Sequence, residues 1–168
     1  MNKKSKTVAF LGLCTTLALI LAYVEILLPP LFSGIPGIKM GLPNIVIIFL
    51  LYKKSARAAI CVSFLRIVLV SMLFGNVMSF AYSFAGAALS LLVMILLSRL
   101  DILSKVGVSV AGGVTHNLGQ VLTAMLLLET SQLGYYMAVL TVTGTIAGIF
   151  VGLCGSVLVK KIPDSLFD

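Results

Sequence analysis

The sequence predicts an all-α integral membrane protein, a bundle of six transmembrane helices forming a single domain over residues 1–168. Apolar residues make up 60% of the chain and charged residues only 10%, whereas soluble domains are about 45–50% apolar and about 25% charged. Long apolar stretches recur, and the basic residues lie at their ends. So few charges cannot cover a soluble globular surface, which excludes a soluble enzyme and a nucleic-acid-binding module.

Six apolar segments predict the helices, and they cover residues 7–28, 43–52, 58–74, 77–98, 106–128 and 133–159. The first continues as far as Pro29, too far for a cleaved signal peptide, so we expect it to be retained as a helix. The second has only ten residues, or about 15 Å of helix, whereas a membrane span needs about 20 residues. We therefore expect a short, broken second helix.

The distribution of basic residues predicts the orientation. Lys39 alone lies on one side of the predicted membrane, and Arg66 lies within a helix. The other side holds ten basic residues: Lys3, Lys4, Lys6, Lys53, Lys54, Arg57, Arg99, Lys105, Lys160 and Lys161. Short basic loops stay in the cytoplasm, so both termini should be cytoplasmic, which agrees with an even number of spans.

Small residues recur every four positions on two helices. Gly144, Gly148 and Gly152 do so in the last helix, where we favour packing inside the bundle. Ala18 and Ala22 do so in the first helix. The same spacing there suits either packing within this bundle or a docking face for another membrane protein.

Two charged positions lie at membrane depth. Arg66 is near the middle of the third helix, where an unpaired charge costs about 2.5–3.5 kcal/mol on insertion scales. It should bind either a charged ligand group or an internal partner. Glu25 is near the outer end of the first helix, and an ion pair with Lys39 in the following loop is the interpretation we favour.

The fifth helix carries the most polar segment of the chain. His116 and Gln120 are four residues apart and Asn117 and Gln120 are three apart, so all three share one helix face near the middle of the membrane. We favour a polar cavity lined by this face, and interhelical hydrogen bonding is the alternative. The loop of residues 36–44, with Lys39 and Asn44, should border the same cavity because irregular backbone is tolerated at that depth only where it is buried or lines a cavity.

Nothing in the sequence predicts catalysis or a cofactor. The five acids (Glu25, Asp101, Glu129, Asp164 and Asp168) form no metal-binding spacing, and no nucleophile has an activating partner. The chain also has no nucleotide-binding loop. The three cysteines lie singly in apolar segments and are read as small packing residues: Cys14, Cys61 and Cys154. We expect a protein that is not an enzyme and holds no metal.

Three segments resemble one known family. Residues 36–45 resemble its P-G-x-K-x-G-L-x-N signature, residues 109–120 resemble its G-x-x-x-H-N-x-G-Q segment, and Arg66 with Leu69 and Phe74-Gly75 resemble its third span. The sequence is similar to the Gx transporter family, whose members often carry the label heptaprenyl diphosphate synthase component I. That family is grouped with the substrate-binding S components of energy-coupling factor transporters.

The resemblance implies a function in a bacterial cell membrane. It implies a six-helix fold that binds a small molecule toward the outer side under the loop after the first helix, with Ala18 and Ala22 docking a coupling protein. The polar residues of several helices independently indicate such a site: Arg66, His116, Asn117 and Gln120 should line it, with Lys39, Asn44 and Glu25 beside it. Since the chain has no nucleotide-binding loop, ATPases on other chains would supply energy. The family label suggests the alternative, a non-catalytic membrane partner of a polyprenyl diphosphate synthase. The prenyl synthases that the label suggests use Asp-rich motifs, which this chain lacks.

Overall fold

The described part of the chain is all-helical. The computed structural model describes residues 2–28 and 40–163, which hold six α-helices, one short 3-10 helix and no strand. The elements are α1 (Lys3–Leu27), α2 (Asn44–Lys53), α3 (Ala56–Phe74), α4 (Val77–Leu100), α5 (Lys105–Leu127), η1 (Gln132–Tyr136) and α6 (Met137–Lys161). The all-helical prediction is confirmed, including the ten-residue second helix. The last predicted segment begins with the 3-10 helix, and its α-helix starts at Met137.

Polar capping residues separate the long helices. Ser55, Asn76 and Ser104 each accept a hydrogen bond from the backbone N–H three residues later, at 3.1, 2.8 and 3.2 Å. Such caps satisfy one of the N–H groups that a helix start leaves without a partner. The caps therefore set where α3, α4 and α5 begin within a sequence that is otherwise almost continuously apolar.

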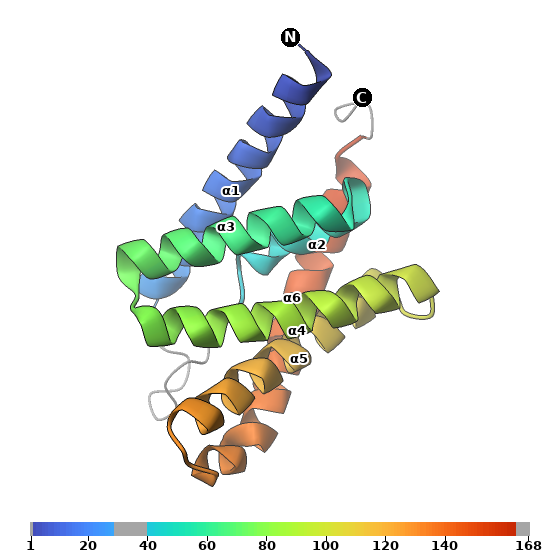
Figure 1. The fold of residues 1–168 in the computed structure, drawn as a ribbon. Coiled ribbons are helices and arrows are strands. Elements are labelled where there is room, and N and C mark those ends of the chain that lie inside the picture. The colour runs from blue at the N-terminus through green and yellow to red at the C-terminus, as the bar shows by residue number, and fades with distance from the viewer. Residues whose placement is uncertain (1, 29–39, 164–168) are drawn as a thin grey trace.

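The helix junctions gather at two opposite ends of the bundle (Figure 1). The α2–α3 and α4–α5 junctions lie together with the end of α6, and the α3–α4 and α5–α6 junctions lie at the other end. At the first end Lys105 Nζ lies 5.4 Å from the centroid of the Tyr52 ring, so the end of α2 meets the start of α5. The first end is therefore the one that carries the basic helix termini.

Four helices are long and apolar enough to cross a membrane. They are α1, α3, α4 and the η1–α6 segment, judged by length and composition. α2 has ten residues and is too short. α5 has 23 residues but is not among the four, and it contains the polar segment around His116.

The outer surface of the bundle is apolar. Val77, Leu126 and Met72 are 82%, 79% and 78% exposed, and large exposed apolar side chains occur along every long helix. Soluble monomers rarely expose apolar surface on this scale. The protein is therefore a multi-pass membrane protein whose apolar faces contact lipid.

The short helix α2 forms the centre of the core. Five consecutive residues, 46–50, are buried, so this helix is covered on every side. It packs with Cys14 and Ala18 of α1 and with Ala59 and Val62 of α3. A helix that is apolar all round belongs in an interior. The predicted packing role of Cys14 is confirmed.

Glycines bring α4, α5 and α6 into backbone contact. A Cβ at Gly148 of α6 would lie 2.6 Å from Val110 Cα, and one at Gly119 of α5 would lie 2.9 Å from the carbonyl oxygen of Ala85 in α4. No real side chain fits at such distances. The predicted packing of the Gly144–Gly148–Gly152 row is confirmed, because all three residues face α5.

Candidate functional site

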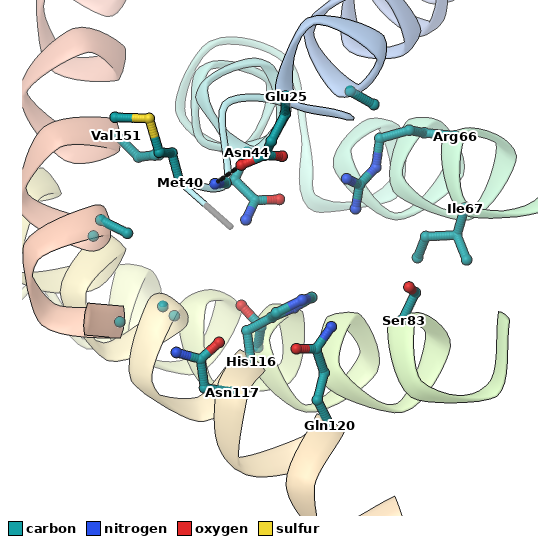
Figure 2. Close-up of a pocket in the computed structure, with 18 of the residues that line it drawn as sticks. Glu25, Met40, Asn44, Arg66, Ile67, Ser83, His116, Asn117, Gln120 and Val151 are labelled. Carbon is teal, nitrogen blue, oxygen red and sulfur yellow. Dashed lines mark hydrogen bonds between the residues drawn. The ribbon is translucent and has the colours of Figure 1, made fainter. Parts of the chain in front are cut away.

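One cavity lies among the six α-helices of the bundle (Figure 2). Its volume is about 100 Å³. A single water needs about 10–15 Å³ by the same measure, so several waters or one small molecule would fit. Its polar lining residues are Glu25, Asn44, Arg66, Ser71, Ser83, Ser90, Ser109, His116, Asn117 and Gln120. They come from α1 through α5, and α6 adds small apolar residues.

Arg66 extends from α3 into the cavity. Figure 2 shows its guanidinium opposite the α5 side chains, on the same side as Glu25. Its Nε atom is buried and has no hydrogen-bond partner, and the side chain as a whole is half-buried. The Glu25 carboxylate acts on the guanidinium electrostatically. The cavity wall therefore contains a cationic donor with an unused N–H.

Glu25 joins the end of α1 to the turn before α2. The backbone N–H of Gly41 donates to Glu25 Oε1. Gly41 has a φ of +72°, in the left-handed region that glycine tolerates best. This contact fixes the start of α2 beside the cavity. Lys39 lies outside the described residues, so the Glu25–Lys39 ion pair and the role of Lys39 at the site remain predictions.

The polar face of α5 both lines the cavity and binds neighbouring helices. His116, Asn117 and Gln120 all line it. Asn117 also donates from Nδ2 to the carbonyl oxygen of Leu140 in α6, at 2.7 Å. Gly86 of α4 lies so close that a Cβ there would be 2.7 Å from the carbonyl oxygen of His116. Cavity lining and interhelical bonding, posed as alternatives from the sequence, therefore occur together on this face.

Sequence reasoning missed the hydroxyl groups of α4. Ser83 and Ser90 line the cavity together with Met94 of the same helix. The two serines are seven residues apart, a spacing that places them on one helix face. This pattern on an apolar helix could have identified α4 as a wall of the site.

The small-residue face of α1 lies inside the bundle. Ala18 is fully buried against α2 and α3, and Ala22 is buried and lines the cavity. These positions correspond to the packing alternative. Docking of a coupling protein at Ala18 and Ala22 remains a prediction, and it now requires α1 to separate from its neighbours.

The comparisons with known proteins identify the family. The family model described as heptaprenyl diphosphate synthase component I matches residues 14–158. The chain belongs to the heptaprenyl diphosphate synthase component I family. The match spans every candidate site residue, from Ala18 to Gln120. Neither the curated proteins nor the solved structures gave a match.

The acids of this heptaprenyl diphosphate synthase component I family member are dispersed in the described ranges. Glu25 lines the cavity, Asp101 follows α4, and Glu129 follows α5 near the opposite end of the bundle. Within residues 2–28 and 40–163 no group of three or more His, Cys, Asp or Glu side chains could hold a metal ion. The family name is that of a synthase component, and the described residues form a polar cavity within a membrane bundle.

Proposed function

We propose that this chain is the substrate-binding membrane subunit of an uptake system for a small anionic or amphipathic molecule. It would sit in the cell membrane of a bacterium with six spans and both termini in the cytoplasm, and ATPases on other chains would supply the energy. The observation that carries the proposal is the unpartnered Nε–H of Arg66 in a cavity lined by polar side chains. Such groups are costly at membrane depth and typically mark ligand or ion pathways.

The composition of α5 supports six spans rather than four. Its polar residues, which lower its hydropathy, face the cavity instead of lipid. α2 is too short to cross alone, but it is buried on all sides, and irregular backbone before a buried helix is tolerated at membrane depth. Both helices can therefore lie within the bilayer although neither meets a simple hydropathy criterion.

The family description favours a second candidate function. Under it the protein would be a non-catalytic membrane partner of a polyprenyl diphosphate synthase, in isoprenoid or quinone synthesis. The cavity would then hold part of a prenyl diphosphate or a regulatory ligand. No described cluster of acidic residues supports magnesium-diphosphate chemistry in this chain.

A capture experiment separates the two functions. The tagged full chain is isolated from its native host in a mild detergent, and retained proteins are identified by mass spectrometry. We expect ATPases and a coupling membrane protein. A prenyl synthase retained without ATPases would overturn the transport function in favour of the second candidate.

A further inference from the structure

The cavity is elongated along α4 and α5. Its lining residues run from Ser83 to Met94 on α4 and from Ser109 to Gln120 on α5. Eleven residues of helix cover about 16 Å, so the lining extends over about this length of the bundle. An extended ligand could contact residues at both ends of the lining, whereas a compact one could not.

The two ends of this space differ in chemistry. Glu25, Arg66 and Gln120 lie toward one end, which we name the charged end. Ser90, Met94, Ser109 and Val151 surround the other, which we name the uncharged end.

The uncharged end is lined by two hydroxyl groups, a thioether and apolar surface. The hydroxyl of Ser90 donates to the sulfur of Met94, at 3.6 Å, so its proton is already used. Gly112 of α5 faces both side chains, because a Cβ there would lie 2.5 Å from Met94 Sδ and 3.2 Å from Ser90 Oγ. A thioether, glycine backbone and Val151 suit a narrow apolar group.

The charged end offers one cationic hydrogen-bond donor beside a carboxylate. Arg66 is the one basic side chain among the described lining residues with a permanent charge, and its Nε–H lacks an acceptor. Glu25 brings a negative charge to the same end and acts on Arg66 electrostatically. Repulsion from Glu25 grows with each negative charge on a ligand. A single carboxylate that accepts a hydrogen bond from Arg66 is therefore favoured over a diphosphate with two or more charges.

We propose that the ligand is an elongated monocarboxylate whose carboxylate accepts a hydrogen bond from Arg66 Nε–H and whose unbranched chain extends to the uncharged end. This inference rests on the proposed function, since it names the substrate class of the same cavity. Such a ligand is both anionic, through its carboxylate, and amphipathic, through its chain.

A chain-length series tests the proposal. The full-length protein in lipid nanodiscs is titrated by calorimetry with acetate, butyrate, hexanoate and octanoate, and separately with hexylamine and inorganic pyrophosphate. Burying one methylene should raise affinity about fourfold until the space is filled. We expect this rise for the acids, and weaker binding of hexylamine and pyrophosphate than of hexanoate.

Variants separate cavity binding from partition into lipid. Arg66→Gln should weaken hexanoate binding by about tenfold to a hundredfold, and Arg66→Lys should recover part of the loss. Ala147 lines the cavity beside Gly148, so Ala147→Leu should stop the rise at a shorter acid. Ile60→Leu, at an exposed position of α3, is the matched control and should bind like the wild type. Thermal unfolding of each variant verifies that it is folded.

Three results would overturn the monocarboxylate proposal. They are absence of acid binding to the wild type, tighter binding of pyrophosphate than of hexanoate, and equal hexanoate binding by wild type and folded Arg66→Gln. Retention of ATPases in the capture experiment would leave the transport function intact in all three cases, so the two failures are distinguishable.

Discussion

The side-chain amide of Asn117 donates a hydrogen bond to the backbone carbonyl oxygen of Leu140, at 2.7 Å, and thereby joins α5 to α6 at the cavity wall. Thr143 Oγ1 donates to the same oxygen at 3.2 Å. In a bilayer, hydrogen bonds of this kind replace part of the driving force that burial from water supplies in soluble proteins. The wall of the cavity is thus held by a residue that also faces the cavity.

Removing this bond should destabilise the protein modestly. We expect Asn117→Ala to lower the free energy of unfolding by about 0.5–2 kcal/mol, the range for interhelical bonds in membranes. The measurement is unfolding in a detergent titration. Thr123→Ala is the control, because Thr123 Oγ1 bonds only within its own helix, to the carbonyl oxygen of Gly119 at 2.8 Å, and should change stability less. Equal losses in both variants would contradict a specific role for the α5–α6 bond.

Glycine contacts predict a larger effect at Gly148. A Cβ there would lie 2.6 Å from Val110 Cα and 2.9 Å from the carbonyl oxygen of Ser109, and both are backbone atoms that cannot rotate away. Gly148→Ala should therefore lower the free energy of unfolding by about 1–3 kcal/mol. Gly12→Ala is the matched control, since nothing lies within 4 Å of its added Cβ, and helix propensity should make it neutral or slightly stabilising. Thermal unfolding measures both variants, and a stable Gly148→Ala protein would show that α5 and α6 can separate freely.

Glu25 should stabilise the folded protein more through its hydrogen bond to Gly41 than through its charge. Glu25→Gln keeps an oxygen that can accept from the Gly41 N–H, whereas Glu25→Ala removes it. We expect Glu25→Ala to lower the free energy of unfolding by about 1.5–3 kcal/mol and Glu25→Gln by clearly less. Denaturant titration of the two variants side by side tests this order. A Gln variant as unstable as the Ala variant would assign the effect to charge instead.

The sequence predicted the helices well because apolar runs, prolines and capping residues act locally. It also identified several side chains that line the cavity, because Arg66, His116 and Gln120 are polar in an apolar context and must turn inward. The burial of Ala18 and the serine wall of α4 were less predictable. A small-residue row has the same spacing whether it faces its own bundle or a partner, and serine is common enough in membrane helices that its position alone does not indicate a cavity.

Ala18 distinguishes internal packing from partner docking. It is fully buried, so Ala18→Trp should overpack the α1–α2–α3 core and lower the free energy of unfolding by about 1–3 kcal/mol or more. Leu17→Trp, at a neighbouring position that is 47% exposed, should be tolerated. Thermal unfolding and capture of partners are measured on both variants. A stable Ala18→Trp protein that no longer retains its partners would instead show that this face of α1 opens for docking.

The position of the α5–η1 turn tests both the orientation and the span count. Arg57, at the start of α3, and Ser131, between α5 and η1, are exposed and are separated by α3, α4 and α5. If all three helices cross, the two residues lie on opposite sides of the membrane. Cysteine is introduced as Arg57→Cys or Ser131→Cys after the three native cysteines are replaced by alanine. We expect a membrane-impermeant maleimide to label Ser131→Cys in intact cells and Arg57→Cys only after permeabilisation, because basic loops remain in the cytoplasm. Labelling of both from the same side would show that α5 does not cross, and the reverse pattern would place the termini outside.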